Sequence, residues 1–459
     1  AQATARPDKV AIGTEDGSVS YAGLADRSAR TMTALAAEGV NAGDRVCWLG
    51  ANGIDWFTAF FATVNLHACF APLNLRLSPP EIAYMLEDSE AKLLLAAAGE
   101  IDLAEAAVAR MARPIPILTI GFDHPGHKRL AIETSAPATP SRLRAEDDML
   151  QLYTSGTTGK PKGVRLTNGN YGAFMVHSAG VDGFDYDSSE TVAIVMPLYH
   201  VAGANVSLAG LAHGCRVLIE KGFDAKRVLG LISTEHVAQV FLAPTLIRML
   251  LEADHDHMAD FSSLRTVGYG SSAITEAVLR EAQARMGCQF TQYYGMTESA
   301  GTGTFLAPKD HQPHLLRSCG KAWPGMEARI MRADGSTAAI GEVGEIVLRG
   351  ETISPGYWKR DDDSRELFHD GWLRTGDAGY ADDNGFLFVH DRIKDMIVSG
   401  GENVYPAEVE NAIAGCPGVS DVAVIGVPSD KWGEEVKAVV VALPGAALTP
   451  DAITRWARE

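Results

Sequence analysis

Short apolar runs alternate with amphipathic helical patterns along the first third of the chain. The short runs predict strands at 45–49, 69–72, 92–96 and 115–120, and the longer segments predict helices at 54–66, 79–87 and 103–111. Ser78 precedes the second of these helices and Glu81 lies three residues after it, which is the pattern of a capping box. Helices of this length between apolar strands predict crossover connections and a mostly parallel sheet.

The same alternation restarts after a polar, Pro-rich connection at 134–148. It predicts strands at 191–196, 216–220, 237–242, 265–269 and 289–293, and helices at 202–212, 225–233 and 275–286. From residue 327 the pattern changes to short strands and Gly turns at 328–331, 344–348 and 385–389, which is typical of a small β-rich module. After Arg392 a strand–helix–strand–strand pattern begins.

These patterns predict an α/β fold in two parts. The larger part, 1–392, is expected to hold two α/β subdomains, at about 1–185 and 186–325, and a β-barrel-like module at about 326–390. A smaller α+β domain is expected at 393–459. Because the last segment of this domain stops inside a helical pattern, we expect the domain to be incomplete.

Composition and charge exclude several classes of protein. The chain has 40 Lys and Arg against 58 Asp and Glu, a formal charge of −18, which disfavours broad nucleic-acid binding. Six scattered cysteines without a C-x-x-C pair predict neither a zinc site nor a disulfide framework and suit the cytoplasm. No signal peptide is predicted, and Asp55, Asn65 and His67 interrupt the most apolar segment, 54–73, so we expect a soluble protein without a transmembrane helix.

The densest chemical signal is the string Y-T-S-G-T-T-G-K-P-K-G at 153–163. Glycine lets backbone amides approach phosphate oxygens, hydroxyls donate hydrogen bonds to those oxygens, and lysine supplies charge. The string is not a Walker A loop, because Gly156 and Gly159 enclose two residues instead of four and Pro161 follows Lys160. We therefore predict a different kind of phosphate-binding loop, with a solvated Ser/Gly linker as the alternative.

This string resembles the signature loop of the superfamily of AMP-forming acyl-CoA synthetases, luciferases and peptide-synthetase adenylation domains. Companion strings follow in the family's order: M-P-L-Y-H at 196–200, Q-Y-Y-G-M-T-E at 292–298, G-E-V-G-E-I at 341–346, R-T-G-D at 374–377, D-R-I-K-D at 391–395 and S-G-G-E-N-V-Y-P-A-E-V-E at 399–410. The resemblance covers essentially the whole chain. It implies an acid–CoA ligase that activates a fatty or aryl acid as acyl-AMP, releases pyrophosphate and then forms the acyl-CoA thioester. The implied small molecules are a carboxylic acid, ATP, Mg²⁺ and coenzyme A.

The resemblance also implies a role for individual residues. The catalytic groups are Thr154, Lys162, His200 and Glu298, and Thr154 and Glu298 are the metal-binding pair. The residues that bind phosphates, adenine and the acyl group are Thr154, Ser155, Gly156, Thr157, Thr158, Gly159, Gly270, Ser271, Ser272, Tyr293, Tyr294, Gly295, Met296 and Thr297. Asp377 and Arg392 bind the ribose, Lys394 is the domain hinge, and Gly400 and Gly401 line the pantetheine tunnel.

Taken singly, several of these residues have ordinary alternatives. Glu298 would be a solvated carboxylate, Tyr294 a strand tyrosine on which the resemblance stacks adenine, Asp377 a turn residue and His200 a packing residue. Small residues follow His200, at Gly203, Ala204, Ala209 and Gly210. They suggest a roomy acyl tunnel, and they suit close helix packing equally well.

The string V-G-Y-G-S-S-A at 267–273 imitates a dinucleotide-binding fingerprint. That fingerprint needs a carboxylate at the end of the next strand, and this strand ends as T-Q-Y-Y with no carboxylate before Glu298. We therefore expect no NAD site and assign the loop, by resemblance, to the wall of the adenine and acyl pocket.

The family's catalytic lysine lies in a Gly-Lys motif late in the C-terminal domain, and no residue up to Glu459 matches it. Taken literally, this chain is expected to adenylate poorly. Two alternatives stay open: a stand-alone adenylation enzyme that passes the acyl group to a carrier protein, and a non-catalytic protein that binds ATP or acyl-AMP. The sequence also leaves open the identity of the acid and a homodimeric state.

Overall fold

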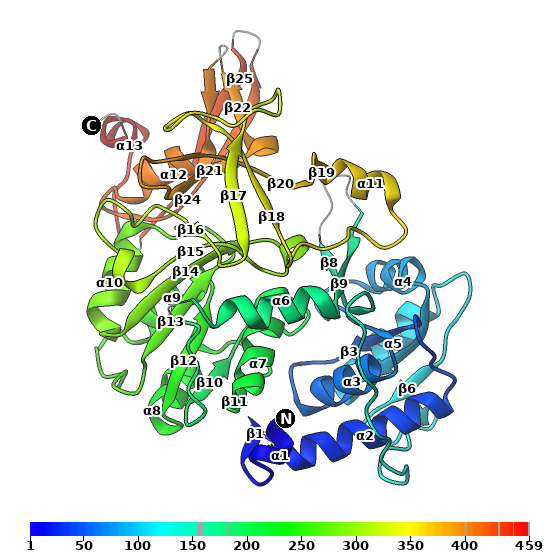
Figure 1. The fold of residues 1–459 in the computed structure, drawn as a ribbon. Coiled ribbons are helices and arrows are strands. Elements are labelled where there is room, and N and C mark those ends of the chain that lie inside the picture. Colours follow the sequence, from blue (N-terminus) through cyan, green and yellow to red (C-terminus); the bar gives the residue numbers. More distant parts are fainter. Residues whose placement is uncertain (155–159, 182, 400–401, 430–431, 444, 458–459) are drawn as a thin grey trace.

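Four sheets organise the computed structural model, which describes residues 1–459 except 155–159, 182, 400–401, 430–431, 444 and 458–459 (Figure 1). A seven-stranded and a nine-stranded sheet with their helices form most of the large body. A five-stranded sheet follows in the chain, and a four-stranded sheet belongs to the C-terminal end. This arrangement confirms the predicted α/β fold class, with two α/β units, a β module and a smaller C-terminal unit.

The seven-stranded sheet contains most of the strands predicted in the first third of the chain. Its spatial order is β7 (Lys128–Arg129), β6 (Ile117–Thr119), β5 (Ala91–Ala96), β3 (Arg45–Leu49), β4 (Cys69–Pro72), β8 (Asp148–Thr154) and β9 (Lys162–Thr167). The crossovers carry α3 (Ile54–Asn65), α4 (Pro79–Asp88), η1 (Ala98–Glu100) and α5 (Ile101–Val108). The capping box of Ser78 and Glu81 is present at the start of α4, with the Ser78 N–H donating to the Glu81 carboxylate at 2.8 Å.

The nine-stranded sheet holds the second α/β unit. Its order is β16 (Lys321–Ala322), β15 (Gly303–Leu306), β14 (Gln289–Gly295), β13 (Thr266–Gly270), β12 (Val237–Leu242), β10 (Thr191–Ile194), β11 (Arg216–Ile219), β1 (Val10–Thr14) and β2 (Gly17–Ser20). Its helices include α7 (Val201–His213), α8 (Ala225–Thr234), α9 (Pro244–Ala253) and α10 (Glu276–Met286). Short η2 (Thr297–Ser299) and η3 (Pro308–Asp310) follow β14 and β15.

The first strands of the chain cross to this second sheet. β1 pairs in parallel with β11, although the sequence pattern assigned residues 1–185 to the first unit. Pairing between segments some two hundred residues apart leaves no local pattern, so the sequence did not reveal it. α1 (Gln2–Ala5), α2 (Tyr21–Ala37) and the central helix α6 (Asn168–Ser178) complete the large body (Figure 1).

The β module and the C-terminal unit are smaller. The module pairs β17 (Met326–Met331), β18 (Gly344–Gly350), β20 (Trp372–Ala381), β19 (Phe368–His369) and β21 (Leu387–Arg392), and it carries α11 (Asp361–Glu366). After η4 (Ile393–Asp395), the C-terminal unit contains β22 (Ile397–Ser399), β23 (Glu402–Val404), α12 (Pro406–Ala414), β24 (Val419–Ser429), β25 (Gly433–Ala442) and α13 (Pro450–Trp456).

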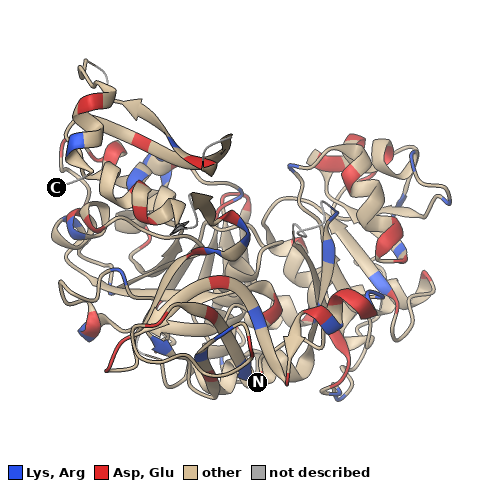
Figure 2. Cartoon of the chain, turned by 90° about the horizontal axis from the view of Figure 1, so that it is seen from above, with Lys and Arg blue, Asp and Glu red and all other residues tan. Residues whose placement is uncertain are grey.

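Charged residues of both signs are spread over the periphery of the molecule, as Figure 2 shows from above. Among the residues that the structure describes, no helix combines the length and the apolar character needed to span a bilayer. The ends of β8, β13 and β14 carry Thr154, Gly270 and Gly295, all from the predicted set. The carboxyl ends of strands in open α/β sheets are the usual place for ligands, so these ends position the candidate site.

Candidate functional site

A cavity of about 380 Å³ lies where β13 and β14 end and meet the β module. Its walls include seven of the predicted residues: Ser271, Ser272, Tyr293, Tyr294, Gly295, Asp377 and Arg392. The cavity also borders Ile274, Leu316 and Val389, which give it an apolar side suited to a planar base. The fold therefore brings together residues that are more than one hundred positions apart in the sequence.

Asp377 is the most firmly held group of this cavity. Tyr294 donates its hydroxyl to Asp377 Oδ2 at 2.6 Å, and Arg392 Nε lies 2.9 Å from Oδ1. β20 and β21 place Asp377 and Arg392 directly opposite each other in an antiparallel pair. Burial raises the pKa of Asp377, and the charge of Arg392 and the Tyr294 hydrogen bond offset part of that increase. We refer to Tyr294, Asp377 and Arg392 as the ribose end of the site, after the role that the sequence motifs predict for Asp377 and Arg392.

Glu345 supports the turn that presents Asp377. The sequence motifs predicted no role for Glu345. The Gly376 N–H donates to Glu345 Oε1 at 3.0 Å, and Arg374 Nε donates to Oε2 at 2.8 Å. Glu345 is itself buried in β18. It is the second glutamate of the G-E-V-G-E-I string at 341–346, which the sequence analysis named only as a companion string.

Glu298 is buried in η2, beyond the end of β14. Tyr357 donates its hydroxyl to Glu298 Oε1 at 2.8 Å, and the Thr154 side chain lies near this carboxylate. Burial raises the pKa of Glu298, and the Tyr357 hydrogen bond offsets part of that increase. The structure thus brings together the predicted metal pair of Thr154 and Glu298, whose oxygen donors suit a hard cation such as Mg²⁺.

Lys162 begins β9 and points to the same region. Its ammonium lies 2.7 Å from Asp363 Oδ1 and 5.3 Å from the centre of the Tyr357 ring. Neither Tyr357 nor Asp363 belongs to a string that the sequence analysis singled out. We refer to Thr154, Lys162, Glu298, Tyr357 and Asp363 as the phosphate end of the site, after the role that the sequence motifs predict for Thr154, Lys162 and Glu298.

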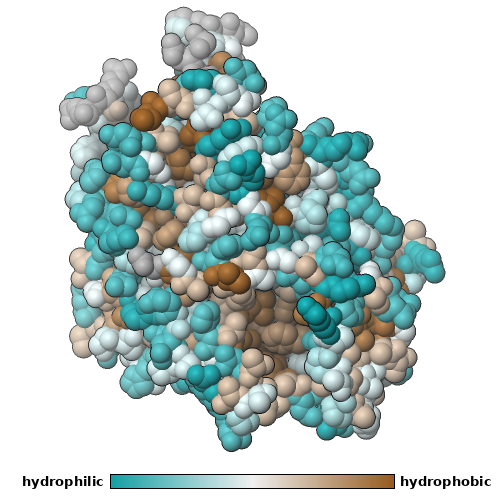
Figure 3. All heavy atoms as spheres, viewed as in Figure 1, coloured by the Kyte–Doolittle hydropathy of each residue, from teal (hydrophilic) through white to brown (hydrophobic). Residues whose placement is uncertain are grey.

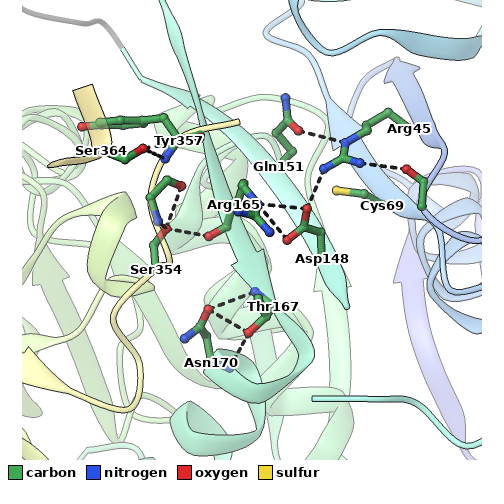
Figure 4. A network of polar contacts seen from close by, with 12 residues as sticks. Arg45, Cys69, Asp148, Gln151, Arg165, Thr167, Asn170, Ser354, Tyr357 and Ser364 are labelled. Atoms are coloured by element: carbon green, nitrogen blue, oxygen red, sulfur yellow. Dashed lines mark hydrogen bonds and ion pairs between the residues drawn. The ribbon is translucent and has the colours of Figure 1, made fainter. Parts of the chain in front are cut away.

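The segment 351–358 is fixed against β9 by a polar network (Figure 4). Ser354 Oγ donates to the Arg165 carbonyl at 2.7 Å, and Asn170 Nδ2 donates to the Ile353 carbonyl at 2.8 Å. On the other side of the hairpin of β8 and β9, Asp148 pairs with Arg165 and Arg45. The network therefore positions Tyr357 beside the hairpin that flanks the predicted phosphate loop.

A second, smaller cavity of about 60 Å³ has an aromatic wall. The wall is made of Phe174, Phe184, Phe241, Tyr293 and Trp323. Ser271 borders both cavities. The aromatic residues come from five separate elements and connections, so no local string predicted them.

His200 is the N-cap residue of α7, and its neighbour Val201 lines the aromatic cavity. The His200 side chain is exposed and lines neither of the two cavities. The suggestion that small residues on α7 open an acyl tunnel is wrong. A Cβ at Gly203 would lie 2.3 Å from the Pro197 carbonyl oxygen, and one at Gly210 would press on Val217. These glycines serve close packing.

The remaining predicted residues fall into two groups. Gly270 needs to lack a side chain, because a Cβ there would lie 2.2 Å from the Tyr293 carbonyl oxygen. Met296 and Thr297 begin η2 and hold Glu298 in its turn. The residues Ser155, Gly156, Thr157, Thr158, Gly159, Gly400 and Gly401 lie outside the described residues.

The C-terminal unit reaches the first cavity. Ala407 and Asn411 of α12 form part of its wall, and the Ala407 N–H donates to Asp391 Oδ2 at 2.8 Å. The ring of Tyr405 stacks on His390 with centroids 4.9 Å apart. Lys394 lies in η4, between β21 and the C-terminal unit, and is exposed. Asn411 was not predicted, because nothing in its local sequence marks it.

Two other features of the described structure lie elsewhere. Glu105, His124 and His127 approach one another next to β7, at the opposite edge of the seven-stranded sheet from β9. An apolar hollow of about 1360 Å³ lies among α2, α3, α6 and α7 (Figure 3). Although this hollow is larger than either cavity above, its lining includes none of the predicted site residues.

Known proteins resemble the chain along its length. The family model described as AMP-binding enzyme matches residues 1–358, and that described as AMP-binding enzyme C-terminal domain matches residues 408–459. A feruloyl-CoA synthase of Amycolatopsis sp is 37% identical over 455 residues, covering 98% of this chain and 89% of that protein. The fatty acid–[acyl-carrier-protein] ligase ScoC of Streptomyces coeruleorubidus is 35% identical over 448 residues, covering 97% and 86%. The structure of o-succinylbenzoate CoA synthetase from Bacillus subtilis, in complex with its acyl-adenylate intermediate, aligns with a TM-score of 0.86 at 30% identity, covering 100% of this chain and 90% of that chain.

Proposed function

The chain belongs to the AMP-binding enzyme family, and from this membership we propose that it is an ATP-dependent acid–CoA ligase. It joins a carboxylic acid to AMP with release of pyrophosphate, and it then transfers the acyl group to the thiol of coenzyme A. The resemblance predicted from the sequence motifs is thereby confirmed, as is the assignment to AMP-forming ligases.

The observation that carries the proposal is the cavity at the ribose end, whose wall includes Tyr294, Asp377 and Arg392. Asp377 presents a fixed carboxylate, and a carboxylate accepts hydrogen bonds from both hydroxyls of a ribose. The apolar side of the cavity suits adenine. Lys162, paired with Asp363, and the neighbouring Glu298 and Thr154 supply the charge and the oxygen ligands with which the triphosphate and its Mg²⁺ would be bound.

In the first half-reaction, a carboxylate oxygen of the acid attacks the α-phosphorus of ATP, and the bond from that phosphorus to the pyrophosphate oxygen breaks. Lys162 binds the departing pyrophosphate by charge, and Asp377 and Tyr294 hold the nucleoside in line. Glu298 and Thr154 would hold Mg²⁺, which when bound would supply neutralisation of the phosphate charge. His200 precedes Val201, which lines the aromatic cavity, and it would lie near the carboxylate of an acid bound there.

In the second half-reaction, the thiolate of coenzyme A attacks the acyl carbon, the bond from that carbon to the phosphate oxygen breaks, and AMP leaves. The C-terminal unit already forms part of the cavity wall through Ala407 and Asn411. We propose that this unit moves about Lys394 between the two half-reactions. The chain position of Lys394, in a short segment between two sheets, supports a hinge role.

A carrier protein is the second candidate acceptor. The observation that favours it is the 35% identity with a fatty acid–[acyl-carrier-protein] ligase. Both acceptors present the same pantetheine thiol, so the cavity alone supports either.

Incubating the full-length protein with ATP, Mg²⁺ and a panel of fatty and aryl acids tests the proposal. Parallel reactions receive coenzyme A or a pantetheinylated carrier protein, and the products are identified by mass spectrometry. The proposal expects acyl-CoA together with AMP. Acylation of the carrier alone would replace coenzyme A as the acceptor, and formation of neither thioester would contradict ligase activity.

A further inference from the structure

Asp363 lies at the phosphate end although no recognised string includes it. Its carboxylate is 2.7 Å from the Lys162 ammonium, and the two side chains are 25% and 11% exposed. Lys162 is the cation that the proposed function assigns to pyrophosphate. In the structure, the charge of Lys162 is therefore neutralised by the Asp363 carboxylate.

The backbone around Asp363 is firmly attached to β9. The Trp358 N–H donates to the Gly163 carbonyl at 2.8 Å, directly beside Lys162 in the chain. The Tyr357 N–H donates to Ser364 Oγ at 2.9 Å, which ties α11 to the segment docked on the hairpin (Figure 4). These backbone hydrogen bonds therefore fix the position of Asp363 next to Lys162.

The neighbouring acidic residues behave differently. Asp362 is 90% exposed and pairs with Arg365, one turn along the same short helix. Asp362 and Asp363 both lie in the first turn of α11, so they contribute similarly to its helix dipole. Only Asp363 turns inward to the lysine.

We infer that Asp363 sets the affinity of the phosphate end: its carboxylate competes with the phosphate oxygens of ATP and pyrophosphate for the Lys162 ammonium. This inference rests on the proposed function of Lys162. A partly shielded ion pair is stronger than an exposed one, so the competition is costly for the incoming phosphate. The measured affinity for pyrophosphate equals the intrinsic affinity multiplied by the fraction of protein in which Lys162 is not paired with Asp363.

Calorimetric binding of inorganic pyrophosphate with Mg²⁺ to the full-length protein tests the inference. Asp363→Asn keeps the size of the side chain and removes its charge, and it is expected to bind pyrophosphate about fivefold more tightly than the wild type. Asp362→Asn removes the same charge one residue away and is expected to change the affinity by less than about twofold. Asp363→Glu restores a carboxylate and is expected to return the affinity toward the wild-type value.

A double-mutant cycle separates competition for Lys162 from a general charge effect. In the Lys162→Ala background, Asp363→Asn is expected to lose its effect on pyrophosphate binding. An equal gain in that background, or weaker binding by Asp363→Asn in the wild-type background, would overturn the inference; the second result would make Asp363 an orienting partner of the lysine. Because the wild type is measured first, absence of pyrophosphate and ATP binding there would instead count against the proposed function.

Discussion

The ribose end and the phosphate end of the site are built in opposite ways. At the ribose end, the predicted groups bind one another: Tyr294 and Arg392 both contact the carboxylate of Asp377. At the phosphate end, the two predicted ionic groups are bound by residues that no motif marked, Glu298 by Tyr357 and Lys162 by Asp363.

The difference follows from the elements that carry the residues. Asp377 and Arg392 are paired neighbours on β20 and β21, and Tyr294 ends a strand of the main sheet. The phosphate end is assembled from β8, β9, η2 and the segment 351–366, which are separate in the chain. We therefore expect the preorganised ribose end to fix a bound nucleoside, and the phosphate end, which is made of several segments, to exchange partners when phosphates bind. Each prediction below tests this contrast.

Asp377→Ala is expected to have the largest effect. It removes the acceptor for the ribose and leaves the Tyr294 hydroxyl and the Arg392 guanidinium without their partner, so the dissociation constants of ATP and AMP are both expected to rise by about 100-fold. Calorimetry with each nucleotide measures this change. Asp383→Ala, in an exposed turn of the same module, is the control. Unchanged AMP binding in Asp377→Ala would show that Asp377 does not bind the ribose.

Lys162→Ala is expected to separate the two ends. Loss of its charge is expected to weaken ATP and pyrophosphate binding by about 10- to 30-fold, while AMP binding changes little, because AMP lacks the pyrophosphate. The exposed Lys359→Ala is the matched control. If Lys162→Ala weakens AMP as much as ATP, the lysine belongs to the nucleoside site and the division into two ends is wrong.

Tyr357→Phe is expected to change the pH dependence of adenylation. Burial already raises the pKa of Glu298, and the hydrogen bond from Tyr357 lowers it. Removing that bond raises the pKa further, so the carboxylate becomes protonated at a higher pH as the solution is acidified. The acid limb of kcat/KM for ATP is therefore expected to move to higher pH, with a loss of about 3- to 10-fold at the acidic end of the pH range.

A pH series from 5 to 8 on wild type and Tyr357→Phe measures the shift. Tyr380→Phe, on β20 and away from Glu298, is the control for loss of a tyrosine hydroxyl. An equal loss of kcat/KM at every pH would show that Tyr357 acts on packing and not on the Glu298 carboxylate.

Glu345→Gln is expected to have the smallest effect. The amide oxygen still accepts from the Gly376 N–H, whereas the ion pair with the half-exposed Arg374 is lost. We expect the free energy of unfolding to fall by about 1 kcal/mol, seen as a decrease of about 1 to 2 °C in Tm. We expect the KM for ATP to rise by about 1.5-fold. A collapse of ATP binding would show that the ribose end depends on this support.

The sequence predicted the fold well where the information was local. The strand at 237–242, the helix of Glu276–Met286 and the capping box at Ser78 follow from periodicity and cap chemistry alone. The pairing of β1 with β11 was missed because no strand was predicted at Val10–Thr14 and because the pairing depends on contacts between distant segments.

The same distinction between local patterns and contacts across the fold applies to the site. Asp377 and Glu298 stand in recognisable strings, and the structure places each in a buried, hydrogen-bonded position. Tyr357 and Asp363 act through contacts with Glu298 and Lys162 across the fold, and no spacing rule connects them. The small residues of α7 misled the interpretation, since close packing and an open tunnel require the same residue types.

Acid-dependent exchange of labelled pyrophosphate into ATP tests the central claim most directly. The reaction uses the full-length protein with ATP, Mg²⁺ and the acid panel, without coenzyme A. The account predicts exchange only when a suitable acid is present, loss of exchange in Asp377→Ala, and release of AMP once coenzyme A is added. Exchange with no acid present, or none with any acid although ATP binds, would contradict an acyl-adenylate-forming ligase.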